Sequence, residues 1–271
     1  MRADLHTHST ESDGTEPPAI VIAQAAAAGL DVVALTDHDT TGGWDEAGIA
    51  ADRLGIDLIR GIEISTRRQG ASIHLLGYGV STEDGPLADE LAQTRISRET
   101  RARHMVDLIA QDYPLSWEQV LAQVPTPETT IGRPHIADAM VAAGLMADRD
   151  EAFASVLHNR SPYHVTHYAP DVAHAVRVVK AAGGRSVLAH SLARKMRRPL
   201  DEELLDELVD AGLDGLEVAH RDHDAHAQEQ LRRWAVQRDL IMTGGSDYHG
   251  DGKKNRIAEN LTSPEMVARL R

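Results

Sequence analysis

The sequence predicts an α/β protein, a parallel barrel interrupted by a helical insertion. Short apolar strand-like segments alternate with helical segments in the first and last thirds of the chain, which is the order that builds parallel β/α barrels. Between about residues 84 and 182 strand signals nearly vanish and helical segments follow one another. We therefore expect a barrel domain from residues 1–83 and 183–271. A mainly helical insertion or lid, including part of a barrel helix, is expected at 84–182.

The first third of the chain contains four strand-like segments. The segment at 31–38 is apolar enough to be buried on both faces of a sheet. The helix expected before it has prolines in its first turn and Gly29 as its stop signal. A polar turn at 66–70 separates the third strand from the fourth. The predicted strands are 2–9, 31–38, 56–65 and 71–80, and the predicted helices are 17–30 and 44–55.

The middle of the chain is expected to be helical, with turns at Pro114, Pro125 and Pro127. Its predicted helices are 87–111, 116–124, 133–144 and 150–157. Strand–helix alternation then returns. The last predicted strands are 185–191, 215–220 and 240–249, separated by helices at 201–212 and 226–239.

The composition limits the kind of site that the chain can build. Cysteine is absent, so a transition-metal site must use histidines and carboxylates. The net charge of −14 argues against a surface that coats nucleic acid broadly, although bound cations could reverse the field locally for a phosphorylated substrate. No apolar run approaches the length of a membrane span, and the N-terminus lacks a signal-peptide pattern, so we expect a cytoplasmic protein.

Histidines and acidic residues fall in or at the ends of the predicted strands. His6 and His8 are two residues apart on the first strand and should face the same side. The carboxyl ends of parallel barrel strands form the rim where active sites are built. Packing alone gives no reason for this repetition, and such groups buried together need cations or hydrogen bonds. The set comprises His6, His8, His38, Glu63, His74, His190, Glu217, His220, Asp247 and His249, with Asp13 close behind the first pair. The pattern therefore predicts a metal site.

Eight segments carry a family resemblance: "DLHTHSTESDG", "ALTDHDT", "GIEIS", "IHLLGYG", "GRPHIADAMVAAG", "AAGGRSVLAHS", "GLDGLEVAHRDH" and "TGGSDYHG". Together they resemble the PHP (polymerase and histidinol phosphatase) family, most closely its stand-alone, TrpH-like phosphoesterases. The resemblance implies a distorted (β/α)7 TIM-like barrel, two to three divalent metal ions and hydrolysis of phosphate esters. Ser191 departs from the proline found after the strand-five histidine in many members, which changes a turn but removes no ligand.

The resemblance also implies which residues bind metal. Its ligand pattern falls on His6, His8, Asp13, His38, Glu63, His74, His190, Asp247 and His249. The implied grouping places His6, His8, Glu63 and Asp247 at one ion, Glu63, His74 and His190 at a second, and Asp13, His38 and His249 at a third. Such nitrogen and oxygen ligands suit Mn²⁺, which we expect, as well as Fe²⁺ or Zn²⁺. The hypothesis is that a hydroxide bridging the metals attacks phosphorus, without a protein nucleophile.

Substrate contacts are predicted outside this set. Arg133, before a helix start, is expected to clamp a phosphate and take part in catalysis, unless it is a solvated or capping arginine. His135 and Arg194 are further substrate-binding candidates, the latter in a basic run that resembles the run at 253–256. Such runs are usually solvated, but both follow rim strands and could steer a substrate with several phosphates. His223 is expected to protonate the leaving group or to orient a neighbour, unless it lies on the surface.

The predicted substrate is a small phosphorylated compound, namely a nucleoside 3′,5′-bisphosphate or the 5′ end of a short RNA. A histidinol-phosphate phosphatase, a non-catalytic PHP module and a metal-dependent amidohydrolase remain alternatives. Tyr163 and Tyr168 could stack on a base or pack in the core. No membrane and no obligate protein partner is expected.

Overall fold

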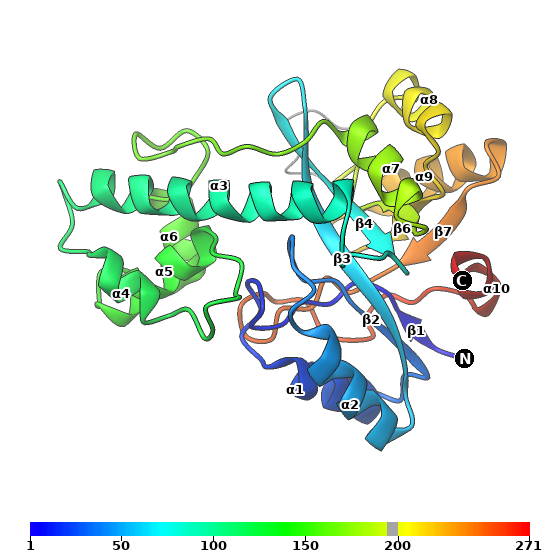
Figure 1. Cartoon of the computed structure of the whole chain (residues 1–271), viewed down its shortest axis with the longest axis horizontal. Coiled ribbons are helices and arrows are strands. Elements are labelled where there is room, and N and C mark those ends of the chain that lie inside the picture. The colour runs from blue at the N-terminus through cyan, green and yellow to red at the C-terminus, as the bar shows by residue number, and fades with distance from the viewer. Residues whose placement is uncertain (194–199) are drawn as a thin grey trace.

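Seven strands form one sheet in the order β1 to β7, curled into a nearly closed barrel in this computed structural model (Figure 1). The structure describes residues 1–193 and 200–271. The segments that follow β1 and β7 complete the circle, since Thr7 forms a parallel bridge with Tyr248 and the His8 amide donates to the Tyr248 carbonyl at 2.8 Å. The strands are β1 (Ala3–Asp4), β2 (Val32–Leu35), β3 (Asp57–Arg68), β4 (Ala71–Tyr78), β5 (Arg185–Leu188), β6 (Gly215–Ala219) and β7 (Ile241–Gly244).

Helices surround the sheet and build the insertion. In Figure 1, α1 and α2 cover the barrel beside β2 and β3, and α7, α8 and α9 cover it beside β4 to β7. Gly29, just after α1, has a φ of +72°, the left-handed region that favours glycine, so its role as a stop signal is confirmed. The helices are α1 (Pro18–Ala27), α2 (Trp44–Leu54), α3 (Pro86–Ile109), α4 (Trp117–Leu121), α5 (Arg133–Ala142), α6 (Arg149–Ser155), α7 (Val172–Ala181), α8 (Glu202–Ala211), α9 (Ala225–Gln237) and α10 (Pro264–Leu270).

The α/β barrel with a helical insertion is confirmed, but the expectation that all strands run parallel is wrong at β4. This strand pairs antiparallel with both β3 and β5. Only Gln69 and Gly70, both with positive φ, separate β3 from β4. Such a tight turn can join only antiparallel neighbours, because a parallel crossover needs a dozen or more residues. As a result β4 ends at the far end of the barrel, where Tyr78 pairs with Arg185, the first residue of β5.

Helix α3 leads the chain from that far end back to the rim. It contains 24 residues and is therefore about 36 Å long. Leu87 and Leu91, near its start, pack in the barrel core with Val176 of α7. Met105 and Ile109, near its end, belong to a separate hydrophobic cluster inside the insertion. One helix thus joins two cores, and Figure 1 shows it running from α7 beside the barrel to α4, α5 and α6.

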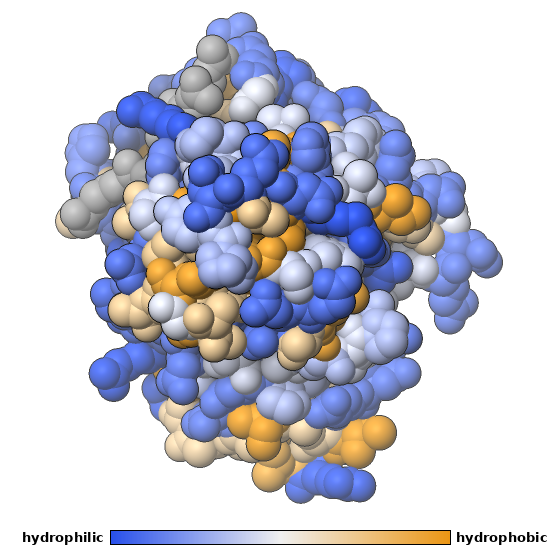
Figure 2. Space-filling model, turned by 90° about the vertical axis from the view of Figure 1, so that its left-hand side faces the viewer, coloured by the Kyte–Doolittle hydropathy of each residue, from blue (hydrophilic) through white to orange (hydrophobic). Residues whose placement is uncertain are grey.

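The insertion is hydrogen-bonded to the loop that follows β1. The Thr130 amide donates to the Glu11 carbonyl at 2.9 Å, and Thr129 Oγ1 donates to the Thr10 carbonyl at 3.1 Å. Arg149 Nη1 donates to the Asp13 carbonyl at 3.0 Å. The insertion is therefore docked on the segment that carries Asp13. Its outer face is largely hydrophilic with smaller apolar areas (Figure 2). The division of the chain into domains at 84 and 182 stays a prediction.

Candidate metal centre

Imidazoles and carboxylates from distant segments meet at the rim of the barrel. In three groups, one ligand atom from each member lies within 4.8 Å of those of the other members. The groups are His8, Asp13, His38 and His249; His6, His8, Glu63 and Asp247; and His38, Glu63 and His74. His190 belongs to none of these groups, but its Nε2 lies 3.0 Å from Glu63 Oε1. We call the nine residues together the candidate metal centre.

The folded chain places these side chains through short, regular elements. His6 and His8 alternate along the end of β1, and their Nε2 atoms face each other at 3.1 Å. A parallel bridge joins His38, after β2, to Glu63 in β3. His74 enters the same place from the antiparallel strand β4, where its Nδ1 is 2.8 Å from Glu63 Oε1. Glu63 is therefore the shared carboxylate at the middle of the set.

The donor atoms fit divalent cations. The buried ring nitrogens His38 Nδ1 and His249 Nε2 make no hydrogen bond to any described residue. Each lies close to a carboxylate oxygen, Glu63 Oε2 at 3.3 Å and Asp13 Oδ1 at 3.1 Å, so a cation held between nitrogen and oxygen would give these buried atoms the partner that such atoms normally have. Burial lowers the pKa of His8, but hydrogen bonds to Asp247 and Glu63 outweigh it and raise that pKa to about 9. The surrounding carboxylates thus create a field that favours positive charge where the ring nitrogens meet.

The carboxylates are held in the ionised form that binds metal. Burial would raise the pKa of Glu63, but His38 and His74 hold it well below its usual range. The pKa of Asp13 is lowered in the same way, because His249 and His38 outweigh its burial. The pKa of His249 itself falls to about 4 through burial and the nearby His8. A neutral imidazole beside ionised carboxylates is the combination that coordinates divalent metals.

Two residues of the candidate metal centre have unusual backbone conformations. His190 has a φ of +28° and Asp247 a φ of +52°, a region that costs non-glycine residues energy and that clusters at functional sites. Both are held by hydrogen bonds. The His190 amide donates to Glu217 Oε2 at 2.8 Å, and the Asp247 amide donates to the His6 carbonyl at 2.8 Å.

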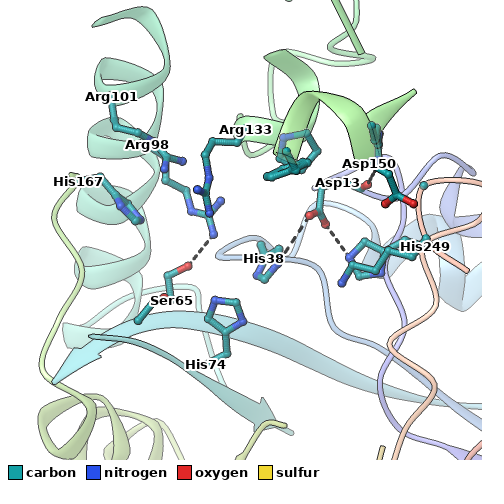
Figure 3. Close-up of a pocket in the computed structure, with 16 residues that line it drawn as sticks. Asp13, His38, Ser65, His74, Arg98, Arg101, Arg133, Asp150, His167 and His249 are labelled. Atoms are coloured by element: carbon teal, nitrogen blue, oxygen red, sulfur yellow. Dashed lines mark hydrogen bonds and ion pairs between the residues drawn. The ribbon is translucent and has the colours of Figure 1, made fainter. Parts of the chain in front are cut away.

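A cavity of about 370 Å³ opens from the candidate metal centre toward the insertion (Figure 3). Asp13, His38 and His249 lie on one side of it, and His74 lies at its floor. The opposite side, which we call the arginine wall, is formed by Arg98, Arg101, Arg133 and His167. Carboxylates and imidazoles of the barrel thus face three arginines of the insertion across one space.

The members of the arginine wall differ in how they are paired. Arg98 Nε is 2.8 Å from Asp39 Oδ2, and Arg98 Nη2 donates to Ser65 Oγ at 2.6 Å. Arg101 is only 7% exposed and makes no hydrogen bond or ion pair with any residue that the structure describes. Burial, followed by repulsion from Arg98 and Arg133, lowers the pKa of Arg101 to about 9. Arg101 is therefore a buried cation without a partner among the described residues.

Comparison with known proteins agrees with this geometry. The PHP domain family matches residues 4–116. A 3′,5′-nucleoside bisphosphate phosphatase from Chromobacterium violaceum is 35% identical over 254 residues, which cover 93% of this chain and 89% of that protein. The chain belongs to the PHP family. Like its relatives, it is a metal-dependent phosphoesterase, a hydrolase of phosphoric ester bonds.

Other PHP relatives extend the comparison over the whole chain. A 5′-3′ exoribonuclease from Haemophilus influenzae is 34% identical over 265 residues, covering 97% of this chain and 96% of its own. A phosphoribosyl 1,2-cyclic phosphate 1,2-diphosphodiesterase from Eggerthella lenta is 34% identical over 255 residues, covering 92% and 95%. A solved structure from Bifidobacterium adolescentis, assigned provisionally to the metal-dependent phosphoesterases, superposes with a TM-score of 0.97 at 42% identity and covers 99% of this chain and 94% of its own. No helix in residues 1–193 and 200–271 is long and apolar enough to cross a membrane.

The grouping within this PHP centre differs in part from the one implied by sequence. His6, His8, Glu63 and Asp247 come together as expected. His38 rather than His190 accompanies Glu63 and His74, and His8 joins Asp13, His38 and His249. Strand order alone could not reveal this sharing, because it depends on ring orientation.

The predicted substrate contacts separate into three cases. Arg133 lines the cavity, where its Nη1 donates to the Leu157 carbonyl and to Asn159 Oδ1. His135 is buried outside the cavity lining, and its Nδ1 accepts a hydrogen bond from the Gly132 amide, so its contacts favour a helix-capping role. Arg194 lies outside the described residues.

The contacts of His223 favour the orienting role over the proton-transfer role. Its Nδ1 donates to the Val218 carbonyl at 3.0 Å, so Nε2 accepts from the Leu192 amide at 3.2 Å. Both nitrogens are occupied by backbone, and His223 does not line the cavity. The ring therefore holds the loop that follows His190. The hydroxyls of Tyr163 and Tyr168 also lie outside the cavity and donate to Asp112 and Glu90.

Sequence reasoning missed most of the arginine wall. Arg98 and Arg101 are three residues apart on a predicted helix, a spacing that places both on one face. That signal was available, but it did not show what the face would meet. His167 also lines the cavity, and nothing in its sequence surroundings indicates this. Lys253, in the second basic run, also lines the cavity and donates to Asp247 Oδ2 at 2.8 Å.

Proposed function

We propose that this PHP phosphoesterase hydrolyses phosphate esters of nucleotides that carry a second phosphate. Nucleoside 3′,5′-bisphosphates and the 5′ ends of short RNA are the two candidate substrates. The observation that carries the proposal is the guanidinium of Arg101, which has no partner within residues 1–193 and 200–271 and faces the candidate metal centre across the cavity.

A phosphate would satisfy the arginine wall. Burying a cation without a partner is energetically costly, and Arg101 has no partner among the described residues. The planar guanidinium binds two oxygens of a phosphate at once, so Arg is the residue suited to this anion. Arg133 lies beside Arg101 in the same wall. Among described residues only its Nη1 forms hydrogen bonds, while its guanidinium lies 5.5 Å from the centroid of the Phe153 ring. One phosphate held here leaves a second phosphate of the same molecule to reach the metal ligands.

The names of the relatives support a substrate with two phosphates. A nucleoside bisphosphate carries two phosphate groups, RNA carries one at each linkage, and a phosphoribosyl cyclic phosphate carries one at each end of the sugar. The relatives with these substrates match this chain along more than 90% of its length. A bipartite cavity with cation sites at both ends is the feature that all three substrates would require.

The residues around the cavity define what the protein contributes to hydrolysis. Bound divalent cations, with Mn²⁺ expected, would supply charge for the phosphoryl oxygens and acidify an attacking water. Lys253 adds a positive side chain at the edge of the candidate metal centre. Ser65 lines the cavity, and its hydroxyl donates to Asp39 while accepting from Arg98. Because this hydroxyl is fully engaged, we infer that water rather than Ser65 attacks phosphorus.

The alternatives fit the cavity less well. Histidinol phosphate has one phosphate and an ammonium group, which the arginine wall would repel. A non-catalytic module has no need for a complete ligand set facing an open cavity. The cytoplasmic location, the native metal and the absence of an obligate protein partner stay predictions.

A substrate panel tests the proposal. Protein reconstituted with Mn²⁺ is offered adenosine 3′,5′-bisphosphate, a 5′-phosphorylated oligoribonucleotide, histidinol phosphate and an aryl phosphate. We expect the first two to be preferred. Release of inorganic phosphate from the bisphosphate would select the phosphatase activity, and release of mononucleotides would select the exoribonuclease. Equal turnover of all four compounds, or preference for histidinol phosphate, would contradict the proposal.

A further inference from the structure

We propose that Glu217 and His220, at the end of β6, are positioning residues that set the metal affinity of the centre without binding metal. This inference rests on metal-dependent hydrolysis but not on the identity of the substrate. Both residues have the same chemistry as the ligands and end a rim strand in the same way. Yet neither belongs to any of the three ligand groups among the described residues.

Glu217 orients the ring of His6. Both side chains are fully buried, and Glu217 Oε1 lies 2.9 Å from His6 Nδ1. A carboxylate only accepts hydrogen bonds, so His6 carries its proton on Nδ1. The lone pair of His6 Nε2 then points to Glu63 Oε2 at 3.3 Å and Asp247 Oδ1 at 3.6 Å. A carboxylate behind a histidine fixes its tautomer and makes it a stronger ligand.

The same carboxylate also holds His190. Glu217 Oε2 accepts a hydrogen bond from the His190 amide at 2.8 Å. The φ of His190 is +28°, a conformation that persists only when surrounding contacts enforce it. One buried carboxylate on β6 therefore fixes two members of the candidate metal centre, a ring on one side and a backbone on the other.

His220 lies beside Asp247, a third member of the candidate metal centre. Its Nδ1 accepts a hydrogen bond from the Asp222 amide at 3.0 Å, so the neutral ring carries its proton on Nε2. This buried Nε2 has no hydrogen bond to any described residue and lies 3.6 Å from Asp247 Oδ2. Lys253 approaches the same oxygen at 2.8 Å. With Oδ2 facing these two donors, Asp247 presents Oδ1 to His6 and His8.

The decisive variant is Glu217→Gln, which preserves size and an acceptor for the His190 amide but removes the charge behind His6. We expect Mn²⁺ affinity, measured by competition with a fluorescent chelator in the absence of substrate, to fall by about 10–100-fold. The number of ions bound at saturation should stay the same. Asp214→Asn is the matched control, because Asp214 likewise accepts from a strand amide, that of Ser186, but at the opposite end of β5. Its Mn²⁺ affinity should equal that of the native chain.

A second variant protects the test against misfolding. His220→Asn keeps an acceptor for the Asp222 amide but removes the donor near Asp247, and about a tenfold loss of Mn²⁺ affinity is expected. Unchanged affinity in both variants, or fewer ions bound at saturation, would overturn the inference, the latter by making these residues ligands. Because no substrate is used, failure of the substrate panel leaves this result intact, and the reverse also holds.

Discussion

The two sides of the cavity differ in how their charged side chains are paired. In the candidate metal centre every carboxylate has histidine neighbours; Glu63 alone lies within 3.3 Å of a ring nitrogen of His6, His8, His38, His74 and His190. The arginine wall has a single carboxylate partner, Asp39, for Arg98, and none for Arg101 among the described residues. On the barrel side the carboxylates thus face imidazoles, whereas on the insertion side Arg101 faces no carboxylate among the described residues.

From this difference we infer that the candidate metal centre carries out the hydrolysis and that the arginine wall recognises the substrate. The ligands come from strand ends and adjoining loops, where a rigid sheet fixes their mutual distances. The arginines come from a helix and a helix start that are docked on the barrel. Substitutions on the first side should therefore abolish the reaction, and substitutions on the second side should change what is bound.

The largest effect is expected for Glu63→Gln. This change removes the negative charge of the carboxylate that belongs to two of the three ligand groups. The rate of hydrolysis of every substrate should therefore fall by about 10³-fold. Initial rates at saturating Mn²⁺, together with metal content by elemental analysis, would check this. Native protein treated with chelator should lose activity to the same extent and regain it with Mn²⁺. If the variant keeps native rates, the candidate metal centre is not where the reaction takes place.

Arg101→Gln should have opposite effects on binding and on stability. We expect kcat/KM for the bisphosphate to fall by about 10–100-fold, the cost of losing a charged hydrogen bond, with little change for an aryl phosphate. Removing an unpaired buried cation should at the same time raise the Tm by about 2–4 °C. Steady-state kinetics and thermal unfolding without ligand measure the two effects.

Arg103→Gln is the matched control, since this residue lies on the same helix but its guanidinium stacks 4.6 Å from the Trp117 ring inside the insertion. Its kcat/KM for the bisphosphate should be native. Equal losses for bisphosphate and aryl phosphate in Arg101→Gln would remove the contrast between the two sides.

Asp39→Asn sharpens the comparison, because Asp39 links the two sides. It follows His38 in sequence, accepts from the Ser65 amide at 2.7 Å and pairs with Arg98. Asn tolerates the φ of +55° found at Asp39, so the change acts on charge. We expect KM for the bisphosphate to rise by about fivefold, the value of one hydrogen bond, with kcat nearly unchanged. A fall in kcat at native KM would instead place Arg98 on the reacting side.

The smallest effect concerns His167 and pH. Burial, followed by Arg101 and Arg98, lowers the pKa of His167 from 6.5 to about 2. Below pH 6.5 the unfolded chain therefore binds a proton that the folded chain does not, and the free energy of unfolding falls as the pH decreases. His167→Gln removes this term, so the decline between pH 6.5 and 5 should be shallower. Urea unfolding in chelator at several pH values measures it, with His226→Gln on the surface of α9 as control. Superimposable curves for native chain and His167→Gln would refute it.

Much of the barrel side could be predicted from sequence, because local signals decide it. Strand ends rich in histidine and carboxylate identify the candidate ligands, since period-two alternation places His6 and His8 on one side. The sharing of Glu63 between two groups was implied by the family resemblance, but the sharing of His8 and His38 and the outer positions of Glu217 and His220 could not be predicted. Glu217 and His220 have the same chemistry as the ligands, and only the orientation of their side chains distinguishes them. The reversal of β4 was visible in the short polar turn at 66–70 but was outweighed by the general alternation.

Of the arginine wall, only Arg133 could be predicted from the sequence. Arg133 precedes a helix start, which singled it out, while Arg98 and Arg101 lie inside a long predicted helix with no local signal of burial. Their burial depends on how α3 crosses the mouth of the barrel, a tertiary arrangement without a local signal. For the same reason the hydrogen bond of His135 to the Gly132 amide at the start of α5 could not be predicted, and a role of His135 in substrate binding stays a prediction.

Because β4 runs antiparallel to its neighbours, the length of α3 determines where its arginines lie along the barrel. Strand β4 ends at the far end of the barrel, so α3 must run the length of the barrel before its arginines lie at the rim. Arg98 and Arg101 sit between its two anchored ends, Leu87 and Leu91 below and Met105 and Ile109 above. Inserting seven residues near its start would keep the same face toward the cavity and shift the guanidiniums by about 10.5 Å. We therefore expect the number of turns in α3 to set the distance between a phosphate held by these arginines and an ester cleaved at the metal centre.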